Sequence, residues 1–223
     1  SNCLLTFAIS ALIIKYLSYN TDYFFVQTHT VKELITKSFQ FSDKRCLVIP
    51  FFEIKDTKIK KVDNDSFVFV SNGNTHKNHE NLISAWEELA KSKIYPELHL
   101  TVTDSFTELI SIIEAAKNKG IKIINHGYTN AYELYSKCNY LIYPSLCESF
   151  GLGLIEAAEC GCNVVASDLP YVHEVVKPTA TFDPLDPISI AKTVEQVLTG
   201  ENAKSTELIV ENRISNLLEF IKK

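Results

Sequence analysis

Short apolar runs alternate with longer amphipathic stretches along most of the chain. The runs are rich in Val, Ile, Leu and Tyr and show little alternation of apolar and polar positions, which indicates strands buried on both faces of a sheet. We predict strands at residues 23–27, 46–49, 67–71, 98–103, 121–125, 140–143, 163–166 and 180–182.

The stretches between these runs carry apolar residues at helical spacing. We predict helices at residues 3–19, 31–38, 80–91, 105–119, 130–137, 151–160, 171–176, 188–198 and 205–221. A repeated succession of strand, helix and strand is typical of a parallel sheet covered by helices on both faces. The predicted fold class is therefore α/β, with a Rossmann-like, doubly wound parallel sheet.

A charged and polar segment, residues 53–66, is typical of a linker. We expect a small unit with its linker at residues 1–60, a main domain at 61–200 and a terminal helix within 201–223. The chain holds no Met and begins with Ser-Asn, so we expect the N-terminal part of a longer protein to precede it. The apolar stretch 3–19 is too short for a membrane span and is expected to be a buried or surface-lying helix.

The charge balance limits the ligands that the protein can bind. The 223 residues carry a formal net charge of −5, which argues against binding nucleic acid through overall charge. Arg45 and Arg213 are the only arginines, so lysine must serve any anion-binding site.

Residue types that bind metals are present without the spacing of a known metal site. A zinc site made of Cys138, Cys147, Cys160 and Cys162 would have unfamiliar spacings, and buried thiols are the favoured interpretation. His76 and His79 are three residues apart and have no evident third ligand. We therefore expect no metal.

In a doubly wound sheet, ligands bind beyond the carboxyl ends of the strands, so chemistry is expected in the strand-to-helix turns. The most informative turn is 144–153 (PSLCESFGLG), which opens a predicted helix. Gly151 and Gly153 let a ligand approach the backbone, and Ser149 is placed to cap the helix. The first N–H groups of that helix favour an anion such as a diphosphate.

Two carboxylates, Glu148 and Glu156, accompany this helix start. In one interpretation, Glu148 caps the turn and Glu156 is a solvated helix position. In the other, both accept hydrogen bonds from sugar hydroxyls, since carboxylates are strong acceptors. The residues alone leave both interpretations open.

The second informative turn is 71–79 (SNGNTHKNH), which follows the strand predicted at 67–71. Its Asn72-Gly73 pair is a turn signal. Lys77 stands at the start of a predicted helix, where it either pairs with a phosphate or is a solvated lysine in a polar loop.

The stretch from Tyr143 to Asp168, in which seven residues separate Glu148 from Glu156, resembles the paired-glutamate signature of group 1 glycosyltransferases. These form the large family 4 of retaining, nucleotide-sugar-dependent enzymes with the GT-B architecture. The turns at residues 69–86, 126–135 and 169–176 match the family in the same order, as does the end at 182–187. The resemblance covers residues 67–198, and several matching turns in order make it specific.

The resemblance implies an enzyme that moves a sugar from a nucleotide-sugar donor to a glycan or lipid-linked acceptor with retention. Residues 61–200 would be the donor-binding domain, 1–60 a remnant of the acceptor-side Rossmann-like domain, and 201–223 would hold the closing helix. A location in the cytoplasm, with peripheral contact at the inner membrane, is the family expectation. The Lys-rich stretch 55–61 would serve that contact or be a solvated linker.

Residue by residue, the resemblance implies that Glu148 and Lys77 are the catalytic positions. Glu148 would bind the donor sugar, Glu156 the ribose, and Lys77 the diphosphate as it leaves. Such a transition state resembles an oxocarbenium ion with negative charge on the leaving phosphate, which a lysine and a helix N-terminus stabilise without a metal or cofactor. The other implied donor-binding positions are Asn72, Gly73, Gly127, Tyr128, Ser149, Phe150, Gly151 and Leu152.

The sequence departs from the family pattern in places. The family often has an Arg shortly before the lysine, where this chain has Asn72 and Gly73, so Asn72 and the backbone replace it or phosphate binding is weaker. Gly153 stands where Pro or Thr is frequent, and Asn163 where Pro is usual. Residues 1–66 hold no counterpart of the family's glycine-rich loop or acceptor-side His, so the chain is expected to bind a donor without transferring its sugar alone.

Three alternatives stay open. The first is a sugar-nucleotide-binding module that is inactive alone or needs a partner acceptor domain. The second is a GT-B epimerase or a sucrose- or trehalose-type synthase, and the third is a scaffold without a ligand. No nucleic-acid partner is expected.

Overall fold

The computed structural model describes residues 16, 18–39, 43–53, 64–201 and 204–222. The chain divides into two compact units, residues 1–52 with 211–223 and residues 53–210. Of the helix predicted at 3–19, only Tyr16, Ser18 and Tyr19 lie within the described residues. Residues 54–63, which include the Lys-rich stretch 55–61, lie outside them.

The smaller unit joins the two ends of the described chain. It contains β1 (Phe24–Val26), α2 (His29–Phe39), β2 (Cys46–Val48) and α9 (Ile214–Ile221), and β1 pairs in parallel with β2. The rings of Tyr23 and Phe25 meet the Phe220 ring of α9 edge-on, with centroids 4.9 and 5.3 Å apart. Aromatic contacts therefore attach the last helix to the first described strand.

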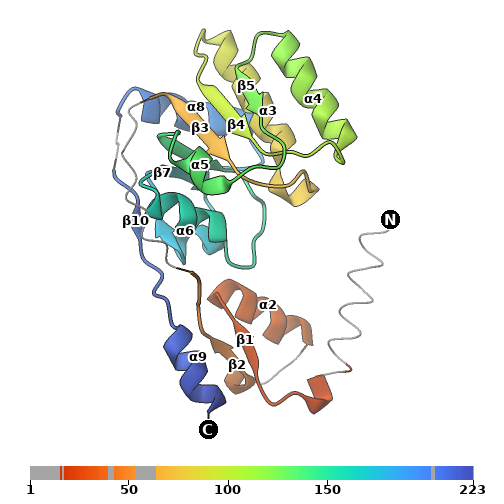
Figure 1. The fold of residues 1–223 in the computed structure, drawn as a ribbon, viewed down its shortest axis with the longest axis vertical. Helices are drawn as coiled ribbons and strands as arrows, with labels where there is room; N and C mark the ends of the chain where they lie inside the picture. The colour runs from red at the N-terminus through yellow and green to blue at the C-terminus, as the bar shows by residue number, and fades with distance from the viewer. Residues whose placement is uncertain (1–15, 17, 40–42, 54–63, 202–203, 223) are drawn as a thin grey trace. The chain divides into compact units, whose positions relative to one another are not determined.

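The larger unit is built on a six-stranded sheet in which every pair of neighbours is parallel (Figure 1). Its strands are β3 (Ser66–Phe69), β4 (Glu97–Leu100), β5 (Ile123–Asn125), β6 (Tyr140–Tyr143), β7 (Asn163–Ser167) and β9 (Ala180–Phe182). The spatial order is β5-β4-β3-β6-β7-β9. This is the order of a doubly wound fold whose winding reverses between β3 and β6, so the predicted fold class is confirmed.

Helices cover both faces of this sheet (Figure 1). They are α3 (His79–Lys91), α4 (Thr107–Asn118), α5 (Ala131–Tyr135), α6 (Leu152–Glu159), α7 (Pro170–His173) and α8 (Pro187–Leu198). Helix α3 contacts α4 and α8, whereas α5 contacts α6. The two groups lie on opposite faces, as right-handed crossovers on either side of the reversal require.

The core explains why the strand sequences lack polar alternation. All four residues of β3 are buried, and Phe67 stacks on Tyr140 of β6 with ring centroids 4.6 Å apart. Trp86 of α3 meets Phe67 edge-on at 5.4 Å, and its indole N–H donates to the Pro96 carbonyl at 3.0 Å. The central strands therefore bury both faces and leave the indole nitrogen satisfied.

Two predicted helices are wrong in part. The helix predicted at 171–176 ends at His173, and Val176 begins β8 (Val176–Lys177). The helix predicted at 205–221 begins only at Ile214, because its first part contains β10 (Glu207–Leu208), which pairs antiparallel with β8.

Hydrogen bonds within the larger unit explain why the first part of the segment 205–221 is not a helix. The Thr206 hydroxyl accepts from the Val164 N–H at 2.7 Å, and the N–H groups of Ile209 and Val210 donate to the Val175 carbonyl. These tertiary bonds hold the segment extended, although its apolar spacing favours a helix.

Among the described residues, no helix has both the length and the apolar content that a membrane crossing needs.

Candidate functional site

The site lies where the winding of the sheet reverses. Strands β3 and β6 are neighbours, and the turns that follow them run to α3 and α6. Ligands of doubly wound folds bind beyond the carboxyl ends of the strands at this reversal. Lys77 comes from the turn after β3 and Glu148 from the turn after β6, so the topology brings the two predicted catalytic residues to one place.

Lys77 and Glu148 form an ion pair. Lys77 Nζ lies 2.6 Å from Glu148 Oε1, and the two side chains are 16% and 12% exposed. The Tyr143 hydroxyl donates to the same oxygen at 3.0 Å. Burial, and then the Glu148 charge, raise the pKa of Tyr143 well above its ordinary value, so this phenol stays a hydrogen-bond donor.

Buried polar contacts fix the two turns against each other. The Leu146 N–H donates to the His76 carbonyl at 2.8 Å. The Asn78 amide donates to the Pro144 and Pro184 carbonyls at 3.1 and 2.7 Å. The Tyr171 hydroxyl donates to the Ser145 carbonyl at 2.8 Å. The ion pair therefore rests on a rigid backbone frame.

Helix α6 begins at Leu152, and its N-cap is Gly151 at a φ of 84°. The predicted cap at Ser149 is wrong, because the chain reverses two residues later in a left-handed conformation that favours glycine. A Cβ on Gly151 would also lie 2.9 Å from a Leu154 methyl. Phe150 is buried beneath the turn, whereas Ser149 and Leu152 are exposed. The N-cap of α6 is therefore a glycine in place of the predicted serine.

The remaining predicted positions differ in their place in the fold and in their exposure. Glu156 is half-buried within α6. Gly127, at a φ of 62°, and the 96% exposed Tyr128 follow β5, the edge strand two places from β3. Asn72 is exposed, and its side-chain oxygen accepts from the Asn74 N–H at 3.2 Å. Their roles in donor binding stay predictions.

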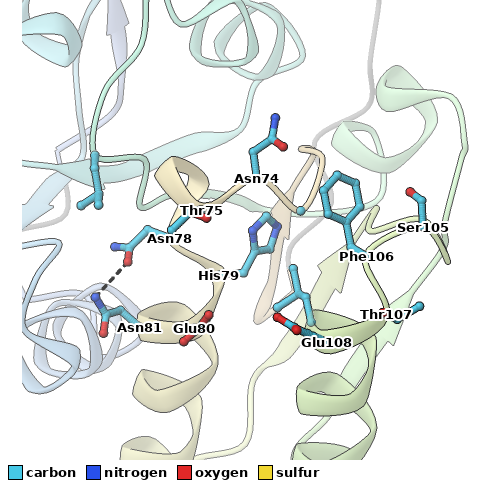
Figure 2. A pocket seen from close by; sticks show the side chains of 13 residues that line it. Asn74, Thr75, Asn78, His79, Glu80, Asn81, Ser105, Phe106, Thr107 and Glu108 are labelled. Atoms are coloured by element: carbon cyan, nitrogen blue, oxygen red, sulfur yellow. Dashed lines mark hydrogen bonds between the residues drawn. The ribbon is translucent and has the colours of Figure 1, made fainter. Parts of the chain in front are cut away.

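Gly73 faces a neighbouring turn at very close range. A Cβ at this position would lie 2.4 Å from Cγ of Phe106, in the turn after β4. The absence of a side chain therefore lets the Phe106 ring pack on the turn that carries Lys77. Gly73 and Phe106 both line a cavity of about 490 Å³ (Figure 2). Asn78, which follows Lys77, and Leu146 also line it, so the cavity adjoins the two turns that carry the ion pair.

The structure brings into the site several residues for which the sequence alone predicts no role there. Tyr143 contacts Glu148, Asn78 ties the two turns together, and His79, the next residue, is buried with its ring 4.9 Å from that of Phe69. Two signals were available: Asn78 directly follows Lys77, and Tyr143 ends a strand at the reversal. The sequence carries no such signal for Phe106, because only its packing on Gly73 shows that it belongs to the site.

No group of three or more His, Cys, Asp and Glu side chains in the described part of the chain is placed to hold a metal. Of the five cysteines described, four are buried free thiols, and Cys147 is exposed, contrary to the buried state predicted for it. Donor binding without a metal stays a prediction.

The sheet order and the turns at its reversal define a Rossmann-like α/β protein of the GT-B type. The chain belongs to the family of group 1 glycosyl transferases, whose model matches residues 51–214.

Three similar proteins illustrate this relationship. The chain is 27% identical over 164 residues to the O-antigen chain mannosyltransferase RfbU of Salmonella typhimurium, a match covering 70% of this chain and 44% of RfbU. The crystal structure of TarM shares the fold, with a TM-score of 0.74 at 18% identity over 86% of this chain and 39% of TarM. The pneumococcal O-GlcNAc transferase GtfA, solved with UDP and GlcNAc, gives a TM-score of 0.69 at 17% identity, over 86% of this chain and 41% of GtfA. The chain thus spans less than half of each of these proteins.

Proposed function

We propose that this chain carries the donor-binding site of a glycosyltransferase that takes a sugar from a nucleoside-diphosphate sugar and transfers it with retention to a glycan or lipid-linked acceptor. The observation that carries the proposal is the ion pair of Lys77 and Glu148 at the reversal of the sheet. It combines a cation suited to a diphosphate with a carboxylate suited to sugar hydroxyls.

In this proposal, the ion pair of Lys77 and Glu148 opens when a donor binds, and each residue takes a new partner. Lys77 turns from Glu148 to the diphosphate and offsets the charge that develops as the nucleotide leaves. The N–H groups at the start of α6 reinforce that effect. Glu148, still held by Tyr143, accepts hydrogen bonds from the sugar. Glu156 would take the ribose hydroxyls.

The names of the relatives support one kind of sugar and acceptor for this proposal. RfbU is described as an O-antigen chain mannosyltransferase, which supports a hexosyl and specifically a mannosyl group, and a polysaccharide acceptor. The structure of GtfA with UDP supports a nucleoside diphosphate as the bound part of the donor. We place the reaction on the cytoplasmic side of a membrane, where nucleotide sugars are available to a growing lipid-linked glycan.

A thermal-shift panel tests the proposal directly. The 223-residue chain is titrated with UDP, GDP, ADP and CMP, each with and without Mg²⁺. We expect one diphosphate to raise the melting temperature to the same extent with and without the metal. A Lys77→Ala variant should lose this shift, and Lys91→Ala, which removes an exposed lysine of α3, should retain it. No shift with any nucleotide, or an equal shift in Lys77→Ala, would contradict the proposal.

A further inference from the structure

The cavity beside the ion pair has a composition different from that of an anion site. It opens between the turn after β3 and the turn after β4, and its volume is about 490 Å³. Figure 2 shows the His79 imidazole between Asn78 and the Phe106 ring, among the lining residues and below Asn74 in this view. Of the predicted donor-binding positions, only Gly73 lines this space, and neither Lys77 nor Glu148 does.

His79 is a buried polar group without a partner. The residue is 3% exposed, and neither ring nitrogen has a hydrogen-bond partner among the described residues. Burial, and then the charge of Lys77, lower the pKa of His79 from 6.5 to about 4, so the imidazole is neutral at physiological pH. A neutral imidazole offers one N–H donor and one acceptor, and here both are unused.

The charges on the cavity lining exclude a second phosphate site. Glu80 and Glu108 line it, and neither forms an ion pair within the described part of the chain. No Lys or Arg belongs to the lining. Two carboxylates repel phosphate, whereas they accept hydrogen bonds readily from hydroxyl groups.

The half-buried ring of Phe106 completes a surface suited to a sugar. It lies on Gly73 and forms one wall, while Asn74, Thr75 and Thr107 supply amide and hydroxyl groups. A pyranose presents an apolar face of C–H groups and a rim of hydroxyls. The first suits an aromatic ring, and the second suits carboxylates, amides and a neutral imidazole.

We propose that this cavity binds one uncharged sugar residue of a glycan, stacked on Phe106 and hydrogen-bonded to His79 and Glu108. The identification of that glycan with the acceptor rests on the proposed function, whereas the sugar site itself does not. Because the His79 nitrogens are enclosed, binding requires the exposed Asn74 side chain or the Phe106 ring to move aside.

Nuclear magnetic resonance of the ¹⁵N-histidine-labelled chain tests this site. The His79 signal is the one missing from His79→Leu. We expect α-linked mannotriose at millimolar concentration to shift it in a saturable manner. Phe106→Ala should weaken the affinity about ten-fold or more, and Tyr95→Ala, a matched exposed aromatic outside the cavity, should leave it unchanged.

The same samples separate this inference from the proposed function. If mannotriose leaves the His79 signal in place, or binds Phe106→Ala equally well, the sugar site is overturned even where a nucleoside diphosphate binds. If tetramethylammonium shifts the signal and mannotriose does not, the cavity is a cation site and the inference is wrong. If mannotriose binds through Phe106 and no nucleoside diphosphate binds, the sugar site stands and the proposed function fails.

Discussion

Lys77 Nζ and Glu148 Oε1 lie 2.6 Å apart, although 71 positions separate the two residues in the sequence. The contact spans the turns after β3 and β6 and is shielded from solvent on most of its surface. Each residue is therefore the other's counter-charge in the ligand-free protein. A substitution of one residue leaves the other without its counter-charge. Single substitutions can therefore show separately what Lys77 and Glu148 each bind.

Lys77→Ala should weaken the binding of a nucleoside diphosphate far more than that of the corresponding nucleoside. A charge-assisted hydrogen bond contributes about 1.5–3 kcal/mol, which corresponds to a loss of about ten- to a hundred-fold in diphosphate affinity. Calorimetric titration of both ligands measures the difference. Equal losses for the nucleoside and the diphosphate would remove Lys77 from the phosphate site.

Glu148→Gln should leave nucleotide binding nearly intact and weaken the intact nucleotide sugar. The amide oxygen can still accept from the Tyr143 hydroxyl, so the turn should keep its conformation. The lost charge weakens the hydrogen bonds to the sugar hydroxyls. It also removes the counter-charge that holds Lys77 in the ligand-free protein, so the free nucleotide should bind no more weakly. Competition between the nucleoside diphosphate and its sugar conjugate measures the two affinities. A large loss for the free nucleotide would show that Glu148 does not act on the sugar.

The sequence predicted the sheet because its central strands are buried on both faces and therefore read as continuous apolar runs. It predicted the turns of Lys77 and Glu148 because parallel strands place their carboxyl ends at one edge. It failed at 205–213, where hydrogen bonds to the Thr206 hydroxyl and to the Val175 carbonyl decide the conformation. It also missed Phe106, since the packing of that ring on Gly73 leaves no local pattern.

His79→Leu should make the larger unit less sensitive to acid. The folded-state pKa of about 4 lies below the unfolded value of 6.5, so the unfolded chain binds more protons between these pH values. The free energy of unfolding therefore falls as the pH drops from 6.5 towards 4, by about 3 kcal/mol from this group. His79→Leu should lack that part of the loss.

Urea unfolding at several pH values, followed by the fluorescence of Trp86, the single tryptophan, measures this effect in the larger unit. At neutral pH, we expect His79→Leu to be more stable by about 1 kcal/mol, because two unsatisfied polar atoms leave the interior. His173→Leu, which changes an exposed histidine, serves as the control. An unchanged acid dependence in His79→Leu would show that His79 has a polar partner in solution.

Gly73→Ala should destabilise the protein by displacing Phe106. The new Cβ would lie 2.4 Å from Cγ of the ring, and such overpacking costs about 1–3 kcal/mol. The same substitution in a Phe106→Ala background should cost less, because the ring contacts at 2.4 and 2.7 Å are gone and only the Cβ contact at 2.8 Å remains. A double-mutant cycle in urea measures the coupling. Additive effects of the two substitutions would mean that Gly73 is required by the backbone of its turn and not by Phe106.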